Sequence, residues 1–298
     1  MHRIGFFARW LSLCALALAA CGPAAPAARP LVISAIPDQD PEKLQRLYGL
    51  VAGYLSKELG VRVEYKAVTD YSASVTAFVV GDLDLVWYGG LTGVQARLQV
   101  EGAETIAQRD IDANFHSVFV ANSASGLRPF TEVEGLAALA GRTFTFGSES
   151  STSGRLMPQY FLGQAGVALG DFKGEAGFSG SHDKTLKLVE AGTYEAGVLN
   201  EQVWKSRVTA GEVDTGKVIA LWTTPAYYDY HWVLHPNAAR DFGADFPVKV
   251  KAALLKLDPS VPEHKAILDL FGAQQFIETS NANYASIEAV ARAIGKIR

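Results

Sequence analysis

A turn rich in serine and threonine at 147–154 is the segment of this chain best suited to hold an anion. It follows the strand-like run 142–146 and precedes Leu156, Tyr160 and Phe161, which have helical spacing. The free backbone N–H groups of such a helix start, the positive end of its dipole and nearby hydroxyl groups together suit the oxygens of a tetrahedral oxyanion. The candidate donors are Ser150, Ser151, Thr152 and Ser153. An ordinary helix N-cap is the alternative, since serine and threonine are also preferred capping residues.

Side chains able to catalyse reactions are present, but not in patterns typical of an enzyme. No Gly-x-Ser-x-Gly turn occurs near 148–153 or 179–181, and the chain has no Walker loop for ATP. His231 and His235 are the only close histidine pair, and they precede Pro236 in an extended segment, so the sequence does not indicate a metal site. We expect a binding protein without cofactor or metal. The alternative is a secreted hydrolase that uses serine, histidine and aspartate on a phosphorus or sulfur ester.

Short apolar strand patterns alternate with amphipathic helical patterns along the chain. The strands are predicted at 31–36, 61–67, 83–87, 105–108, 117–121, 143–146, 176–179, 196–199 and 218–222, and the first helices at 41–59 and 72–80. This alternation predicts mostly parallel sheets with helices on both faces. Ligands in such folds bind beyond the carboxyl ends of the strands, which is where the hydroxyl-rich turn lies.

The length and the apolar crossings predict two lobes. About 268 residues follow position 30 (298 minus 30), enough for two units of ordinary domain size. The segments 115–121 and 227–234 would carry the chain from one lobe to the other and back, and the helical stretch 248–298 would pack on the first lobe. We therefore expect a clamshell with lobe 1 at 31–118 and 230–298 and lobe 2 at 119–229, its anion site facing the cleft.

The N-terminus has the pattern of a targeting segment. Arg3 and Arg9 precede an apolar run at 10–20, which is too short to span a bilayer if cleavage follows. The sequence Leu-Ala-Ala-Cys at 18–21 resembles a bacterial lipobox, in which the cysteine is lipidated and becomes the first residue. We expect a lipoprotein signal peptide at 1–20, and a plain signal peptide is the alternative.

Cleavage before Cys21 would discard Cys14 and leave one lipidated cysteine, so no intramolecular disulfide is expected. The alanine- and proline-rich segment 21–30 reads as a tether. The protein is thus expected to be exported and lipid-anchored, in the periplasm or at the outer face of the cytoplasmic membrane.

The charge balance limits the class of partner. The formal net charge is −4, and loss of Arg3 and Arg9 would make it −6. An acidic chain without a basic run argues against nucleic acid or an anionic lipid surface as partner. A small anion is not excluded, because helix N-termini and neutral donors bind one without net positive charge.

The motifs taken together resemble the phosphonate-binding (PhnD-type) solute receptors of ABC transporters, over almost all of the mature chain. The resemblance rests on five segments in the right order, at 68–71, 84–89, 151–154, 180–183 and 224–229. It implies a two-lobed periplasmic-binding fold that closes over a small oxyanion and delivers it to a membrane permease. A monomer is expected.

The resemblance also implies roles for single residues. Ser151 and Thr152 would donate hydroxyl and backbone N–H bonds to the anion, and Tyr71 and Tyr88 would add phenolic donors from lobe 1. His182 and Asp229 complete the implied site, His182 as a donor from lobe 2 and Asp229 as an acceptor for a protonated ligand oxygen. The alternatives are that the tyrosines are core residues, that His182 only follows a cap at Ser181, and that Asp229 belongs to an aromatic seam between the lobes.

The chain departs from the family pattern at two places. Receptors of aminoalkyl phosphonates have a carboxylate that pairs with the ligand amine, and either Glu201 or Gln202 occupies that region here. The returning crossing at 227–232 is bulkier and more aromatic than the pattern of phosphonate receptors. Because this bulk reduces the space for an organic tail, we expect a small inorganic oxyanion such as phosphite or selenate.

Overall fold

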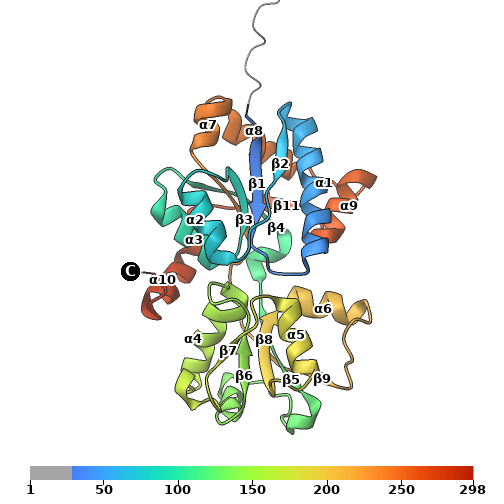
Figure 1. Cartoon of the computed structure of the whole chain (residues 1–298), viewed down its shortest axis with the longest axis vertical. Coiled ribbons are helices and arrows are strands. Elements are labelled where there is room, and N and C mark those ends of the chain that lie inside the picture. The colour runs from blue at the N-terminus through green and yellow to red at the C-terminus, as the bar shows by residue number, and fades with distance from the viewer. Residues whose placement is uncertain (1–28, 298) are drawn as a thin grey trace, which may run out of the picture.

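The structure, a computed structural model, describes residues 29–297, which form two α/β lobes joined by two chain crossings (Figure 1). The sheet of the first lobe has the order β11-β4-β10-β3-β1-β2. Its strands are β1 (Leu31–Ala35), β2 (Val63–Tyr65), β3 (Leu85–Tyr88), β4 (Glu104–Arg109), β10 (His231–Leu234) and β11 (Phe276–Glu278). Its helices are α1 (Pro41–Leu59), α2 (Tyr71–Val79), α3 (Gly90–Gln99), α7 (Asn237–Phe242), α8 (Phe246–Leu255), α9 (Pro262–Phe271) and α10 (Ala285–Ala293).

The second lobe contains a sheet of order β7-β6-β8-β5-β9. Its strands are β5 (Ser117–Asn122), β6 (Phe144–Phe146), β7 (Gly177–Phe178), β8 (Ala196–Asn200) and β9 (Val218–Thr223). Its helices are α4 (Met157–Gln164), α5 (His182–Glu190) and α6 (Glu201–Thr209). The two-lobed α/β clamshell predicted from the sequence is confirmed by this architecture.

Helix α1 shows how local chemistry sets these elements. The carboxylate of Asp40 accepts from the backbone N–H groups of Glu42 and Lys43, and Pro41 occupies the first turn. The helix ends at Gly60, whose φ of 66° suits glycine. The apolar side chains at helical spacing are buried against the sheet.

The sheets are mixed rather than mostly parallel. Strand β1 runs parallel to β2 and β3, whereas β10 runs antiparallel to both β3 and β4. In the second sheet β6 is parallel to β7 and β8, and β5 is antiparallel to β8 and β9. The reason is that β5 and β10 begin directly after a crossing rather than after a helix that covers the sheet, so each enters its sheet in the reverse direction.

Two strands of the first lobe differ from the sequence-based expectation. The crossing predicted at 227–234 ends as β10, which lies between β3 and β4, and the helical stretch predicted at 248–298 contains the short strand β11. The predicted lobe boundaries, after residues 118 and 229, stay predictions, although the chain changes sheet at β5 and returns at β10.

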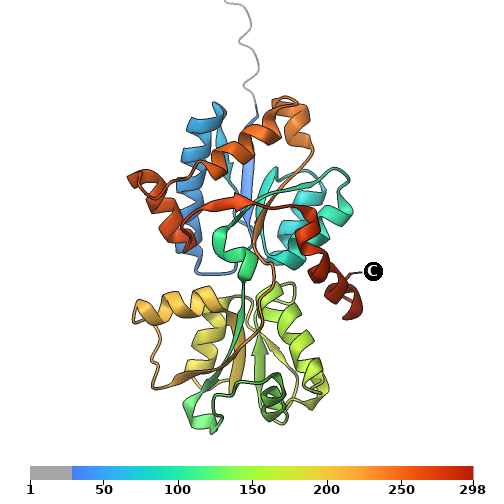
Figure 2. The same ribbon diagram turned by 180° about the vertical axis from the view of Figure 1, so that it is seen from behind.

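The crossings lie side by side between the lobes (Figure 2). Phe115 and Tyr227, one on each crossing, exchange backbone hydrogen bonds of 2.9 and 3.0 Å. The first crossing contains the short helix η1 (Asp110–Asn114). This paired backbone is the natural hinge, because few other main-chain connections would have to change when the lobes move.

Arg29 fixes the point at which the chain enters the first lobe. Its guanidinium donates to both carboxylate oxygens of the buried Asp84 at 2.8 and 2.9 Å, pairs with Asp241 and lies over the ring of Phe242. The predicted signal peptide, the lipidation site Cys21 and most of the predicted tether lie outside the described residues.

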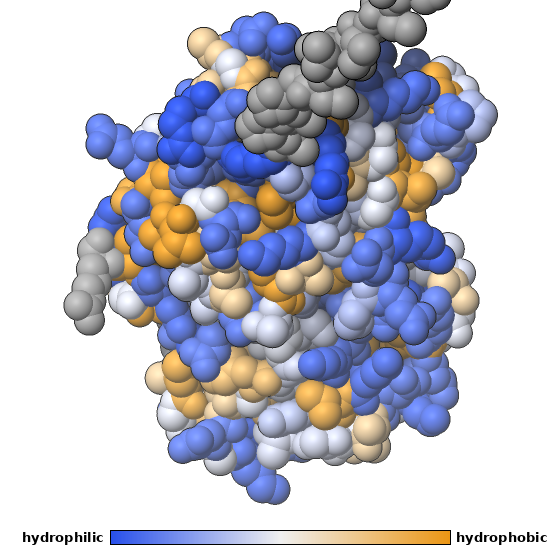
Figure 3. Space-filling model, turned by 45° about the horizontal axis from the view of Figure 1, so that its top comes forward, coloured by the Kyte–Doolittle hydropathy of each residue, from blue (hydrophilic) through white to orange (hydrophobic). Residues whose placement is uncertain are grey.

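No helix within residues 29–297 is long and apolar enough to cross a membrane. On the face shown in Figure 3, hydrophilic residues are interspersed with small apolar groups. Exposed apolar side chains such as Val80 and Val248 are ordinary for a protein surface.

Candidate functional site

The hydroxyl-rich turn forms a π-helical segment, η4 (Thr152–Leu156), that precedes α4. Ser151 caps it, since its Oγ accepts the N–H of Gly154 at 2.9 Å, so the N-cap interpretation is confirmed for this residue. A Cβ at Gly154 would lie 2.9 Å from that Oγ and 3.2 Å from the Cα of Gly147. The glycine therefore allows the turn to fold back against the end of β6.

The first lobe meets this turn through the N-terminus of α3. The backbone N–H of Leu91 donates to Thr152 Oγ1, and that of Gly90 donates to Asp229 Oδ1, each at 2.9 Å. Thr152 belongs to the second lobe and Asp229 to the returning crossing. Both side chains are buried, with exposures of 2 % and 1 %. The lobes are therefore closed on each other at this point.

Three buried polar atoms beside this contact have no hydrogen-bond partner among residues 29–297: Tyr71 Oη, Ser153 Oγ and Asp229 Oδ2. They come from the first lobe, the second lobe and the returning crossing. An unsatisfied buried polar group costs about 1–3 kcal/mol, so three of them at one place call for a ligand or water. Two of the atoms can donate and one is a carboxylate oxygen. The set matches an anion that accepts from hydroxyl groups and also carries a proton.

The pKa values of Tyr71 and Asp229 are shifted by burial and by the polar groups around them. Burial raises the pKa of Tyr71 well above its usual value, Asp38 and Asp229 add to the rise, and the hydroxyl of Ser151 opposes it. Burial also raises the pKa of Asp229 to about 7, against the opposing effects of the Gly90 N–H and of nearby hydroxyl groups. Asp229 is thus close to half-protonated at neutral pH.

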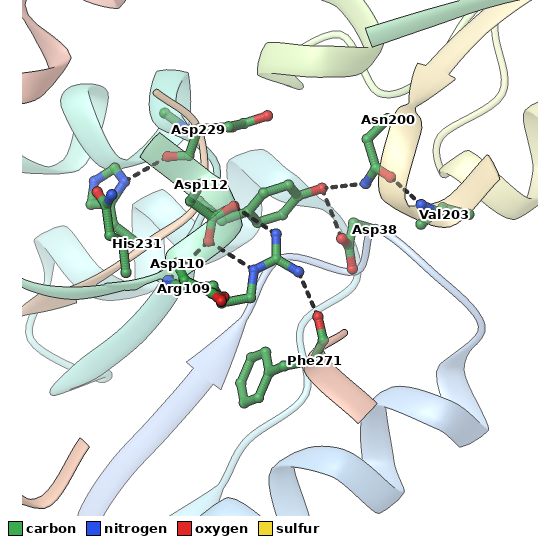
Figure 4. A network of polar contacts seen from close by, with 12 residues as sticks. Asp38, Arg109, Asp110, Asp112, Asn200, Val203, Asp229, His231 and Phe271 are labelled. Carbon is green, nitrogen blue, oxygen red and sulfur yellow. Dashed lines mark hydrogen bonds and ion pairs between the residues drawn. The ribbon is translucent and has the colours of Figure 1, made fainter. Parts of the chain in front are cut away.

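A second set of polar contacts links the lobes through Tyr230, whose partners Asp38 and Asn200 are labelled in Figure 4. Its hydroxyl donates to Asp38 Oδ2 of the first lobe at 2.9 Å and accepts from Asn200 Nδ2 of the second lobe at 3.0 Å. His182 Nε2 lies 3.2 Å from the same oxygen, and His182 Nδ1 accepts from the backbone N–H of Asn200. Burial lowers the pKa of His182 to about 4, so the ring is neutral. In this structure His182 thus contacts Tyr230, next to the turn rather than among the unpartnered atoms.

A buried ion pair at the start of the first crossing packs against Tyr230. Arg109 makes two bonds to the carboxylate of Asp112, at 2.6 and 2.7 Å, and a third to the carbonyl of Phe271. Its guanidinium lies 4.9 Å from the ring centre of Tyr230. Sequence reasoning missed this pair. The available signal was an arginine ending an apolar strand with an aspartate three residues later.

The remaining predicted residues lie apart from the unpartnered atoms. Tyr88 is buried, but its hydroxyl donates to the carbonyl of Ser74 at 2.8 Å inside the first lobe. Ser150 is half-buried at a neighbouring groove. Glu201 pairs with Lys205 and lines, with Gln202, a groove of about 850 Å³ between the lobes. The ligand roles of Tyr88, Ser150 and Glu201 stay predictions, and the geometry places other residues nearer to the candidate site.

Among residues 29–297 no group of three or more histidine, cysteine, aspartate or glutamate side chains could hold a metal ion. The candidate site instead consists of hydroxyl groups, backbone N–H groups and one carboxylate.

The model of the family described as ABC transporter, phosphonate, periplasmic substrate-binding protein matches residues 33–284. The chain belongs to this family. Its members are substrate-binding proteins of ABC transporters and not enzymes, so this chain is a substrate-binding protein and the hydrolase alternative has no support.

The similarity to individual members covers most of the chain. The probable ABC transporter phosphite binding protein PhnD1 of Prochlorococcus marinus (strain MIT 9301) is 48% identical over 269 residues, which are 90% of this chain and 91% of that protein. The structure of PhnD1 in complex with methylphosphonate matches with a TM-score of 0.88 and covers 90% of this chain and 98% of that one. The phosphonates-binding periplasmic protein of Escherichia coli (strain K12) is 24% identical over 244 residues, 80% of this chain and 68% of that protein.

Proposed function

We propose that this chain captures phosphite, or a phosphonate as small as methylphosphonate, between its closed lobes. The observation that carries the proposal is the set of three buried, unpartnered atoms on Tyr71, Ser153 and Asp229. A phosphorus oxyanion with one protonated oxygen satisfies all three, because two of its oxygens accept and the third donates. The related protein PhnD1, which is named a probable phosphite binding protein and whose structure is a complex with methylphosphonate, agrees with this chemistry.

The burial of the site limits the size of the ligand. Tyr71, Thr152, Ser153 and Asp229 are each no more than 2 % exposed. A ligand with a long organic tail would hold the lobes apart and break the bonds from α3 to Thr152 and Asp229. This supports an inorganic anion or a one-carbon phosphonate over an aminoalkyl phosphonate.

The carboxylate of Asp229 favours phosphite and phosphonate monoanions over sulfate and selenate. Sulfate and selenate carry no proton at neutral pH, so they have no hydroxyl to donate to Asp229, and their oxygens are repelled wherever its carboxylate is ionised. A phosphite or phosphonate monoanion offers a hydroxyl to the same atom. We therefore propose that selenate, which the sequence left open, binds weakly.

The ligand acts by holding the lobes together. It contacts both lobes only in the closed form, so its binding energy shifts the population toward that form, which the permease of the transporter recognises. We also propose that Cys21 is lipidated after removal of residues 1–20, and that the segment up to residue 30 tethers a monomeric receptor to the membrane.

Calorimetric titration with phosphite, methylphosphonate, 2-aminoethylphosphonate, phosphate, sulfate and selenate tests the ligand class. We expect phosphite or methylphosphonate to bind most tightly and sulfate and selenate least. Tightest binding of 2-aminoethylphosphonate or of selenate would refute the proposal.

Ser153→Ala tests the site itself, with Ser150→Ala as the matched control. Within residues 29–297 the hydroxyl of Ser153 makes no hydrogen bond of standard geometry, so its loss should change the ligand-free melting temperature little. A lost bond to a charged ligand is worth about 1.5–3 kcal/mol, so phosphite affinity should fall about 10- to 150-fold. Ser150→Ala should bind as the unchanged protein does. Equal affinities for all three proteins would show that Ser153 does not face the ligand.

A further inference from the structure

The first lobe contacts the second lobe and the returning crossing where β3 ends and α3 begins. Gly89 is the N-cap of α3, and the next two N–H groups make the bonds to Asp229 and Thr152 described above. The backbone of Gly89 has φ −77° and ψ 165°, a conformation that any residue adopts. The backbone of this segment therefore gives no reason for glycine.

The reason lies across the cleft. A Cβ at Gly89 would lie 3.1 Å from Thr152 Oγ1 and 3.3 Å from Asp229 Oδ1. The remaining neighbour, Ile36 Cδ1 of the same lobe, would be at an ordinary contact distance of 3.6 Å. The two tight contacts thus involve the second lobe and the returning crossing.

We propose that Gly89 is a positioning residue that sets how closely the lobes approach when they close on the ligand. Without a side chain at this position, the N-terminus of α3 reaches both Thr152 and Asp229. A side chain there separates the lobes, weakens both bonds and enlarges the space around the anion. This inference rests on the proposed capture of an oxyanion by closure.

The effect of a side chain at Gly89 falls mainly on the closed form. When the lobes separate, Thr152 moves away with the second lobe and the Cβ faces the open cleft. A substitution therefore changes ligand affinity and closure while leaving the fold of each lobe intact. A residue that only supported the fold would lower stability without regard to ligand.

Gly89→Ala and Gly89→Val test the inference by calorimetry with phosphite and methylphosphonate and by small-angle scattering. Gly49→Ala is the control, since no atom of residues 29–297 that could be crowded lies within 4 Å of a Cβ at that position. We expect affinity to fall by between about 5- and 150-fold, the range that overpacking of a tight contact produces, with valine worse than alanine. The radius of gyration with saturating ligand should stay above that of the unchanged protein, and the ligand-free melting temperature should be preserved.

A double-mutant cycle with Thr152→Ala separates steric contact from other causes. Removal of the Thr152 hydroxyl relieves the contact, so Gly89→Ala should weaken binding less in that background than alone. Full affinity and full compaction of Gly89→Val, or strictly additive effects in the cycle, would overturn the inference. Failure of the unchanged protein to bind either ligand would instead overturn the proposed function. Binding of phosphite by the unchanged protein without compaction would contradict closure, and with it the role of Gly89, but not the ligand class.

Discussion

Replacing Asp229 by asparagine changes one atom of the candidate site and should reverse its preference for protonated over fully ionised oxyanions. Oδ1 of the asparagine still accepts from the N–H of Gly90, which in this structure is a bond of 2.9 Å. The amide nitrogen then replaces the unpartnered Oδ2, so a donor faces the ligand where an acceptor was. A protonated ligand oxygen loses its partner, whereas a fully ionised oxyanion gains one.

The size of the effect follows from burial. A bond between a buried carboxylate and a ligand hydroxyl is worth about 1.5–3 kcal/mol, so Asp229→Asn should lower phosphite affinity about 10- to 150-fold. Sulfate and selenate affinities should rise, because the repulsion by the carboxylate disappears.

The same variant should change the pH dependence of closure. Burial raises the pKa of Asp229 from 3.8 to about 7, so the ligand-free closed form takes up a proton between about pH 4 and 7. The destabilising effect of the buried charge is absent below about pH 4 and complete above about pH 7. This group therefore favours closure in acid, and Asp229→Asn should remove its contribution.

Calorimetry with phosphite and sulfate at pH 6 and pH 8 measures both effects. Asp82→Asn is the matched control, because that carboxylate is 60% exposed and 3.4 Å from Lys66. The reasoning is refuted if Asp229→Asn binds phosphite within about threefold of the unchanged protein and shows no gain for sulfate.

Three further predictions concern the residues around the site. Asp112→Ala leaves Arg109 as an uncompensated buried charge, so it should lower the free energy of unfolding by about 3–5 kcal/mol, measured by urea denaturation. A loss below about 1 kcal/mol would contradict the role of this pair. Burial lowers the pKa of His182 to about 4, so the ¹⁵N shifts of its imidazole should stay constant between pH 5 and 8. The neutral ring should destabilise the fold only as the pH falls from about 6.5 toward 4. A titration of His182 near pH 6.5 in the folded protein would contradict its burial. Tyr71→Phe should lower phosphite affinity without loss of stability. Tyr88→Phe should instead lower the free energy of unfolding by about 1 kcal/mol and retain phosphite affinity. The reverse pattern would show that Tyr88, and not Tyr71, contacts the ligand.

Much of the fold could be predicted because the local signals were strong. The predicted helix at 41–59 coincides with α1, whose proline, capping aspartate and terminal glycine are all encoded nearby. Strand β10 was predicted only as part of a crossing, since its central place in the sheet depends on a partner far away in the chain. Strand β11 was missed in a helical stretch because a three-residue strand has too little periodicity to register.

The candidate site was predictable by residue type more than by contact. The turn at 147–154 and Asp229 were identified, and both lie at the closed contact with α3. The placement of Tyr88 could not be foreseen, because the direction of a phenol on a buried strand depends on which helix packs over it. The link from Asp38 through Tyr230 to His182 joins three segments that approach one another only when the lobes close.

The sequence by itself determined the chemical class of this protein. Hydroxyl groups at a helix start, an acidic chain and ordered motifs are local or compositional properties, and they were enough to predict an oxyanion-binding receptor with two lobes. Only the tertiary structure decided which polar atoms lack partners, that Asp229 has its pKa raised to about 7, and that Gly89 lies against Thr152. The physical reason is that burial, pKa and steric contact depend on which lobe covers which, and the chain acquires these properties only when its two halves close.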